Sequence, residues 1–305
     1  MTRALVIGSE GNIGSRLVAR LREDGYDIKE ADTRPGMRDN YVMADINHPI
    51  DLLEAFDWGP EVVFILSAMV GRALCEQASG LAIATNLAGI NNVLQLCKRV
   101  GARTVFFSTS EVYGPHLDLM DEELPHLRPN NRYGLSKLLG EQLVEYEVRT
   151  YGLRAVTLRP FMIYDEREEL GAHRSAMIRF ASNLAAGRTV EVHGGTARGW
   201  MHITDAVRAV EAATRVDEYA AINIGHPDVR PMEELVEMIR AELDAPGDLI
   251  KVLPQPPQMT PVKQPLLERQ RTILGIEPLV SLEDGVERVC REIQRRLALE
   301  PLRVG

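Results

Sequence analysis

Short runs of apolar and β-branched residues alternate with amphipathic stretches through the first half of the chain. Residues 12–24 and 81–100 carry apolar side chains at the i, i+3, i+4 spacing of a helix. The apolar runs between and beside them are predicted to be buried strands, at residues 3–8, 26–32, 61–67 and 103–108. Continuous apolar strands separated by helices are typical of a parallel sheet covered on both faces. The pattern therefore predicts an α/β fold.

The pattern changes after residue 160. A helix at 133–151 and a strand at 154–160 continue the alternation, but from about residue 165 glycine, proline and charge interrupt it more often. Residues 253–265 form a proline-rich connection. We expect a first domain at 1–160 and a smaller, mixed α/β domain at 161–305, with some segments returning to the sheet.

Composition narrows the range of partners. The formal net charge is -9, which argues against affinity for nucleic acid or an anionic membrane, because that binding needs a basic surface. No apolar run reaches the ~20 residues of a membrane helix, and the N-terminus does not read as a signal peptide. The three cysteines are widely spaced, and the seven histidines show no metal-ligand spacing. We expect a cytoplasmic protein that binds a small molecule and no metal.

A glycine-rich turn joins the first strand to the first helix. Gly8, Gly11 and Gly14 lie at this junction, where glycine allows a tight turn and close approach of the backbone to a pyrophosphate. Asp32 ends the second strand, where it would accept the ribose hydroxyls of NAD and repel a 2′-phosphate. Arg34 could instead attract that phosphate, which would favour NADP. The context predicts a Rossmann-type doubly wound sheet with NAD as its cofactor.

Tyr133 and Lys137 lie one turn apart on the predicted helix at 133–151, and therefore on one face of it. A neighbouring ammonium and a positively charged nicotinamide ring would both favour the ionised form of the tyrosine. The pair thus offers a phenolate base.

Thr109, Ser110 and Glu111 follow the strand at 103–108 directly. Because the carboxyl ends of parallel strands meet at the ligand crevice, these side chains should emerge next to the nicotinamide and Tyr133. Glu111 is well placed to remove a proton beside a substrate ketone. The alternative is that it caps the turn or forms a salt bridge away from the site.

The Gly-x-x-Gly-x-x-Gly turn, the "STSEVYG" strand end and Tyr-x-x-x-Lys together resemble the extended short-chain dehydrogenases/reductases, in the group of NAD-dependent nucleotide-sugar epimerases, dehydratases and decarboxylases. The resemblance implies that Tyr133 is the base and that Thr109 hydrogen-bonds the reacting sugar oxygen. It places Asp45 on the adenine amino group. The cofactor-binding residues that it implies, beside those above, are Asn12, Ile13, Asp45, Ile46, Leu66, Ser67, Ala68, Asn86, Tyr133 and Lys137.

The second half of the chain resembles the same family with departures. "RGWMHITDAVRAV" implies that Arg198 contacts a substrate diphosphate, and Lys263 stands near the position of a second phosphate-binding arginine. Asp165 and Glu166 replace a usual Gly-Pro, and Met162 replaces an asparagine. Arg167 is a further candidate to bind an anionic group of the substrate.

These features predict an enzyme that oxidises C4 of a nucleoside-diphosphate sugar, uses the 4-keto group and returns the hydride. Glu111 favours 4,6-dehydration or a related reaction that removes the C5 proton. Alternatives are 4-epimerisation, decarboxylation of a uronic acid, NAD(P)H-dependent reduction of a non-nucleotide carbonyl, or a regulator without turnover. The resemblance also implies a homodimer built from residues 81–100 and 133–151.

Overall fold

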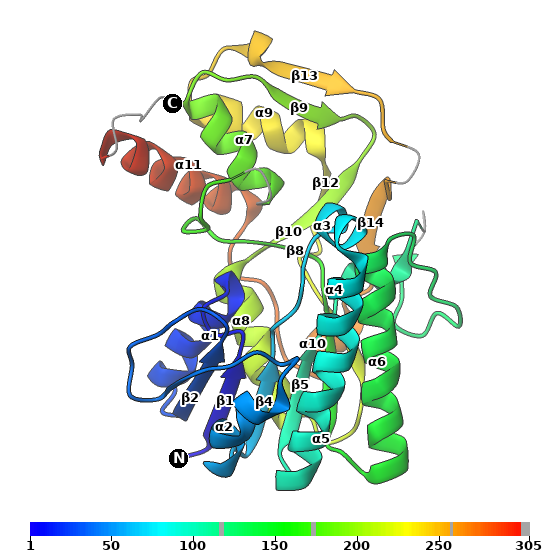
Figure 1. The fold of residues 1–305 in the computed structure, drawn as a ribbon. Coiled ribbons are helices and arrows are strands. Elements are labelled where there is room, and N and C mark those ends of the chain that lie inside the picture. The colour runs from blue at the N-terminus through cyan, green and yellow to red at the C-terminus, as the bar shows by residue number, and fades with distance from the viewer. Residues whose placement is uncertain (116–118, 172–174, 257–258, 300–305) are drawn as a thin grey trace.

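The computed structural model describes residues 1–115, 119–171, 175–256 and 259–299. Seven parallel strands form its main sheet in the order β11-β7-β5-β4-β1-β2-β3 (Figure 1). Their bounds are β1 Arg3–Ile7, β2 Asp27–Asp32, β3 Tyr41–Met43, β4 Val62–Ile65, β5 Arg103–Phe107, β7 Ala155–Pro160 and β11 Ala221–Ile224. The strand order reverses between β1 and β4, which is where such sheets bind ligands. The predicted Rossmann-type fold is confirmed.

Helices cover both faces of this sheet. On one face α1 (Asn12–Glu23) and α8 (Ile203–Ala212) pack over a core that includes Val6 and Phe64. On the other, α5 (Ile90–Val100) and α6 (Arg132–Tyr151) pack over Leu5 and Val63. Because successive strand residues face opposite layers and both layers are apolar, the strands read as continuous apolar runs. The short α2 (Leu53–Asp57) follows a 3₁₀ turn at Pro49–Leu52.

The helix predicted at 81–100 is present and contains a π-helical turn. The structure has α3 (Arg72–Gln77), α4 (Ser79–Ile83), a π-helical turn at Ala84–Gly89, and then α5. A π-helical turn adds a residue per turn and often occurs at functional sites. The apolar spacing predicted the helix over residues 81–100 and could not show the wider turn within it.

Most of the remaining elements form a second part at the carboxyl end of the main sheet, whereas α10 and the 3₁₀ turn at Ala213–Arg215 pack against the main-sheet strands β11 and β5 (Figure 1). The core of the second part is built from helices α7, α9 and α11 with buried Tyr164 and Trp200. The bounds are α7 Ala176–Ala185, α9 Met232–Glu242, α10 Glu268–Thr272, α11 Leu282–Leu299, β6 Leu119–Met120, β8 Met162–Tyr164, β9 Val190–His193, β10 Ala197–His202, β12 Val229–Pro231, β13 Ile250–Leu253 and β14 Val262–Pro265, with 3₁₀ turns at Ser110–Tyr113, Ala213–Arg215 and Gly247–Leu249.

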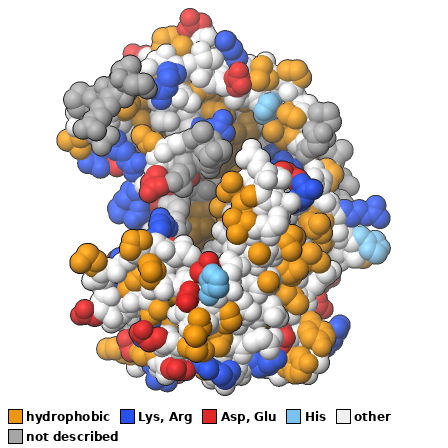
Figure 2. Space-filling model, viewed as in Figure 1, with side chains coloured by type: hydrophobic (Ala, Val, Ile, Leu, Met, Phe, Trp, Pro, Cys, Tyr) orange, Lys and Arg blue, Asp and Glu red, His pale blue; other side chains and the backbone are white. Residues whose placement is uncertain are grey.

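Two features of this part position the site. β10 pairs with β8, β12 and β14, and β14 pairs with β6, so strands from distant parts of the chain meet above β5. The space-filling view shows the surface hollowed between the two parts (Figure 2).

In the described part of the chain no helix is long and apolar enough to cross a membrane.

Candidate active site

The glycine-rich turn holds three segments in close contact. Gly8 has a positive φ of 91°, and a Cβ there would lie 2.7 Å from the backbone nitrogen of Ser67. A Cβ on Gly14 would lie 2.0 Å from the carbonyl oxygen of Gly8. Only glycine fits these two positions. A ligand can therefore contact the backbone N–H groups at the start of α1 directly, with no side chain between them.

A cavity of about 770 Å³ opens over this turn. The cofactor-binding residues predicted from the strand ends and turns all line it, namely Gly8, Gly11, Asn12, Ile13, Gly14, Asp32, Arg34, Asp45, Ile46, Leu66, Ser67 and Ala68. The hydroxyl of Ser67 is buried there without a hydrogen-bond partner in the described residues. An orphaned polar group beside a turn that excludes any side chain fits an elongated polar ligand such as a dinucleotide.

Asp32 is fixed at the edge of this cavity. Its carboxylate accepts the backbone N–H groups of Glu10 at 3.0 Å and Arg34 at 3.1 Å. The guanidinium of Arg34 forms an ion pair with the same carboxylate at 3.5 Å. A 2′-phosphate here would meet the Asp32 charge first, so the arrangement fits NAD better than NADP.

Asp45 and Asn86 have different surroundings. The Asp45 carboxylate accepts the backbone and side-chain N–H groups of Asn47 at 2.9 and 2.8 Å, which fixes the turn that lines the cavity. Asn86 is fully buried within the π-helical turn. It hydrogen-bonds both backbone groups of Met69 and the hydroxyl of Ser136. Asn86 therefore joins the segment beside the cavity to α6 and does not line the cavity itself.

The predicted reacting side chains meet above β5. Asn131 caps α6 by accepting the N–H of Gly134 at 2.9 Å, and Tyr133 follows on the first turn. Thr109, the residue that caps the 3₁₀ turn after β5, lies near Tyr133. Burial raises the pKa of Tyr133 above its usual value, and the neighbouring Thr109 side chain offsets this only in part. In the protein by itself the phenol is therefore neutral at physiological pH.

Lys137 lies one turn further along α6 and is almost fully buried. Its Nζ atom lies 4.7 Å from the centre of the Phe106 ring. Burial lowers the pKa of Lys137 to about 8, although the nearby Glu141 carboxylate opposes this. Lys137 is thus a cation that can lose its charge near neutral pH.

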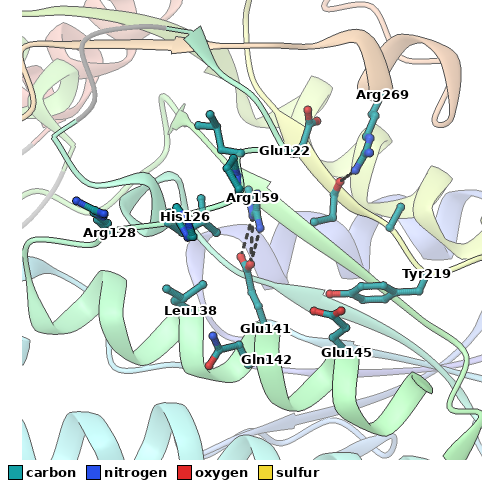
Figure 3. A pocket seen from close by; sticks show the side chains of 15 residues that line it. Glu122, His126, Arg128, Leu138, Glu141, Gln142, Glu145, Arg159, Tyr219 and Arg269 are labelled. Atoms are coloured by element: carbon teal, nitrogen blue, oxygen red, sulfur yellow. Dashed lines mark hydrogen bonds and ion pairs between the residues drawn. The ribbon is translucent and has the colours of Figure 1, made fainter. Parts of the chain in front are cut away.

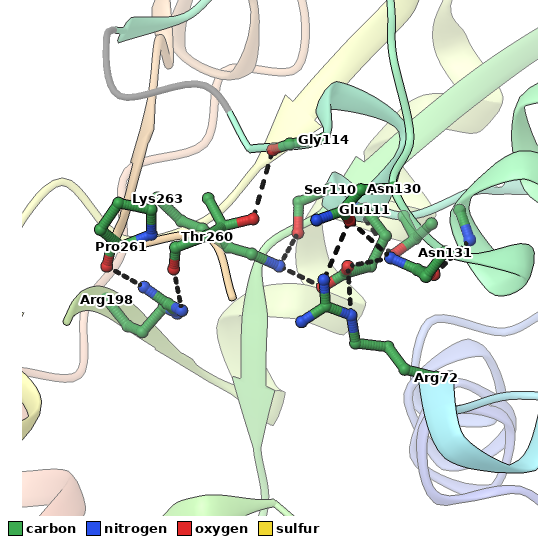
Figure 4. A network of polar contacts seen from close by, with 12 residues as sticks. Arg72, Ser110, Glu111, Gly114, Asn130, Asn131, Arg198, Thr260, Pro261 and Lys263 are labelled. Atoms are coloured by element: carbon green, nitrogen blue, oxygen red, sulfur yellow. Dashed lines mark hydrogen bonds and ion pairs between the residues drawn. The ribbon is translucent and has the colours of Figure 1, made fainter. Parts of the chain in front are cut away.

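Glu111 does not have the surroundings of a general base. Its carboxylate contacts Lys263 Nζ at 2.5 Å, Arg72 Nε at 3.2 Å and Asn131 Nδ2 at 2.8 Å (Figure 4). Burial would raise the pKa of Glu111, but the two cations outweigh it and lower the pKa to about 2. The expectation that Glu111 removes a substrate proton is not supported, because such a carboxylate holds a proton too weakly. The alternative of a salt bridge fits the geometry.

Of the three predicted substrate-binding residues, two lie together. Arg198 and Lys263 are register partners on β10 and β14, and both are buried. The Arg198 guanidinium donates to the carbonyl oxygens of Thr260 and Pro261 at 2.6 Å each (Figure 4). Ser110 joins this group, because its hydroxyl accepts from Lys263 at 3.2 Å. Arg167 lies elsewhere and lines the cofactor cavity.

The departures at residues 165 and 166 form ion pairs. Asp165 is buried and accepts from Arg16 Nε of α1 at 2.6 Å. Glu166 accepts from His202 Nε2 at 2.8 Å, and this contact is the main reason that the pKa of Glu166 falls to about 2. His202 also accepts the N–H of Thr204 and so caps α8. Both pairs hold the segment after β8 beside the cofactor cavity.

The sequence did not indicate a buried network behind these residues. Glu141 of α6 forms a two-pronged ion pair with Arg159 of β7 and accepts from the hydroxyl of Ser108 at 2.5 Å. The network borders a second cavity, of about 590 Å³, which contains none of the predicted site residues (Figure 3). It fixes the end of β5 to α6 and hence Thr109 to Tyr133. The one signal in the sequence for this network was the presence of charged residues, Glu141 and Arg159, within elements predicted to be buried.

Comparisons with known proteins agree with this geometry. The sequence model of the NAD dependent epimerase/dehydratase family matches residues 4–225, which is more than half of the chain. UDP-glucuronic acid decarboxylase 6 of Arabidopsis thaliana is 28% identical over 97% of this chain and 90% of its own. A UDP-glucose 4-epimerase of Mycolicibacterium smegmatis is 26% identical over 93% and 96%. The crystal structure of a UDP-glucose 4-epimerase from Thermotoga maritima with UDP-glucose superposes with a TM-score of 0.89 at 25% identity, over 98% of this chain and 100% of that one.

The family match covers the glycine turn, the Thr109 strand end and the Tyr133–Lys137 pair. An enzyme with NAD as its cofactor, of the type that epimerises, dehydrates or decarboxylates nucleotide-sugars, follows from that match and from the relatives at near full length. The chain belongs to the NAD-dependent epimerase/dehydratase family.

Proposed function

We propose that this enzyme binds a nucleoside-diphosphate uronic acid, oxidises its C4 transiently and removes the C6 carboxylate as carbon dioxide. The observation that carries this proposal is the state of Glu111. It is held by Lys263 and Arg72 with a pKa lowered to about 2, which disfavours the C5 proton removal that dehydration needs. Decarboxylation needs no such base, and the cations suit an acidic sugar.

Tyr133 is the proposed base for the C4 hydroxyl. NAD supplies the hydride acceptor at C4 and later the hydride donor, and its oxidised ring carries the positive charge that would favour the phenolate. Thr109, which lies near Tyr133, would hydrogen-bond the reacting oxygen. Lys137, one turn along α6, adds a second positive charge while it remains protonated. Burial in this site strengthens each of these electrostatic effects.

The middle step follows from the chemistry of the ketone. Once C4 is a carbonyl, the C6 carboxylate belongs to a β-keto acid. The C5–C6 bond can then break, carbon dioxide leaves, and the electron pair passes to the C4 oxygen. Tyr133 and Thr109 would stabilise that oxygen by hydrogen bonding. A proton from solvent adds to C5, the hydride returns to C4, and Tyr133 returns its proton to the C4 oxygen, so the cycle closes without net redox change.

The remaining cofactor roles are also proposals. We propose that the start of α1 and the glycines bind the pyrophosphate, that Asp32 binds the adenosine ribose, and that Asp45 faces the adenine. Arg198 and Lys263 would contact the diphosphate or the acidic group of the sugar, whereas Arg167 would lie on the cofactor side. Asn86 would act by positioning the segment at Met69.

We also propose a cytoplasmic homodimer that joins α4, the π-helical turn, α5 and α6 of both subunits. These helices carry exposed apolar side chains, among them Ile83, Leu135 and Tyr146. Such side chains are candidates for burial in an interface.

Product analysis tests the proposed function. The purified protein should convert UDP-glucuronate to a product lighter by carbon dioxide, without accumulating reduced cofactor. Tyr133→Phe should lower kcat at least ~100-fold, the usual size of a general-base effect, while its NAD content stays unchanged. Loss of water would support dehydration instead, and an unchanged mass would support 4-epimerisation. Stoichiometric consumption of NADH or NADPH would support a reductase.

Epimerisation of the same uronate is the second candidate. It is favoured by the near-complete match to 4-epimerases and uses the same base and the same hydride transfer. It differs from decarboxylation in that the C6 carboxylate is retained and the hydride returns to the opposite face of C4. Mass spectrometry of the product separates it from decarboxylation.

A further inference from the structure

Four charged side chains from four different elements meet beside Thr109. Arg72 comes from α3, Glu111 from the turn after β5, Arg198 from β10 and Lys263 from β14 (Figure 4). Glu111 contacts Arg72 and Lys263 directly, and its charge also acts on Arg198. The cluster therefore contains three cations and a single carboxylate.

Lys263 needs an anion where it lies. It is 5% exposed, and in the described part of the chain its one ion pair is with Glu111. A buried ammonium without a partner is costly, and a neighbouring anion offsets that cost. Glu111 meets that need while no substrate is bound.

Arg72 has a looser contact in the same cluster. Its side chain is 35% exposed, and its Nε atom lies 3.2 Å from Glu111, compared with 2.5 Å for Lys263. It also donates a hydrogen bond to Asn130 at 3.0 Å. A partly exposed guanidinium at the margin of the cluster can turn toward an incoming anion.

We propose that Glu111 is a resident counter-ion in place of the substrate carboxylate, and that Arg72 is a specificity residue that transfers from Glu111 to that carboxylate. This inference rests on the proposed function, because it assumes an acidic sugar. A carboxylated sugar disturbs the Arg72–Glu111 pair but provides a new anion for Arg72. A neutral sugar provides no such anion, so the cluster selects against it.

Binding measurements on the NAD-loaded protein test this role. Tyr133→Phe serves as the background, so that ligands bind without turning over. Isothermal titration would compare UDP-glucuronate with UDP-glucose in Arg72→Met, in Glu111→Gln and in Arg99→Met. Arg99 is the matched control, because it is an arginine that pairs with Asp57 on the surface of the sheet domain.

Arg72→Met should weaken UDP-glucuronate binding at least ~10-fold, as expected when one partner of a charge pair is lost. Its effect on UDP-glucose should stay within about twofold, as should both effects of Arg99→Met. Glu111→Gln should tighten UDP-glucuronate binding relative to UDP-glucose, because it removes the competing anion while keeping a similar shape. A variant that folds poorly would bind both ligands more weakly by the same factor. The ratio of the two affinities therefore changes only when the cluster itself distinguishes the two sugars.

Equal weakening of both ligands in Arg72→Met would overturn the specificity role and leave the proposed function intact. A weaker preference for UDP-glucuronate in Glu111→Gln would overturn the counter-ion role of Glu111 alone. Failure of the background protein to bind either UDP-sugar would overturn the inference and the proposed function together.

Discussion

Glu111 shows how much the chemistry of one residue depends on its neighbours. Its place after β5 suggested a base, whereas its contacts indicate a permanent anion. Lys263 lies 152 residues further along the chain, so no local pattern could have predicted the pair. Gly8, Gly14, Asp32, Tyr133 and Lys137 could be predicted, because their positions within one strand-turn-helix unit or one helix face determine their surroundings.

The low pKa of Glu111 predicts an effect on stability against pH. A carboxylate whose pKa is about 2 in the folded protein and 4.5 when it is exposed to water stabilises the fold above pH 4.5. That contribution is lost as pH falls from 4.5 toward 2. Glu111→Gln should lower the free energy of unfolding by about 2 kcal/mol at pH 7 and by less at pH 4.

Denaturant titrations of both proteins at the two pH values measure this difference. Asp57→Asn, which removes one carboxylate of an exposed pair, is the control and should change the free energy of unfolding by less than about 1 kcal/mol at both pH values. A destabilisation by Glu111→Gln that is equal at pH 7 and pH 4 would contradict the ion-pair account.

At the scale of elements, the segment after β8 lies against α1 through the Arg16–Asp165 pair. Arg167 and Glu168 of this segment line the cofactor cavity. We expect the pair to keep NAD bound between turnovers, which an enzyme that returns its hydride requires. Asp165→Asn should increase the rate of NAD loss several-fold while preserving the hydrogen bond that the side chain accepts from the Arg167 N–H.

The NAD content of the protein before and after extended dialysis, measured by chromatography of the released nucleotide, checks this expectation. Asp57→Asn serves again as the control. Equal retention by Asp165→Asn and the unchanged protein would show that the pair has no part in holding the cofactor.

Elements themselves were predictable where one physical signal dominates. The apolar runs predicted β1, β2, β4, β5 and β7 to within two residues at each end, because burial on both faces leaves little choice of residue. The π-helical turn at 84–89 was not predictable, because it depends on the hydrogen bonds of Asn86 to Met69 and Ser136. Those partners come from other segments of the chain.

For the molecule as a whole, β11 and α8 come from the chain after residue 160 and pack onto the main sheet. The strands β10 and β14 together bring Arg198 and Lys263 over the end of β5. The glycine turn and the Tyr133–Lys137 pair could be recognised from sequence, but the charged cluster depends on this return of the chain.

The central claim is that hydride leaves C4 of a uronate and returns to the same carbon within one active site. The most direct measurement uses UDP-glucuronate labelled with deuterium at C4 and follows the label by mass spectrometry and proton NMR. We expect a product that has lost carbon dioxide and retains deuterium at C4, with no label in solvent or in released cofactor. Deuterium found in free reduced cofactor, or loss of carbon dioxide from a product without the label at C4, would contradict the account.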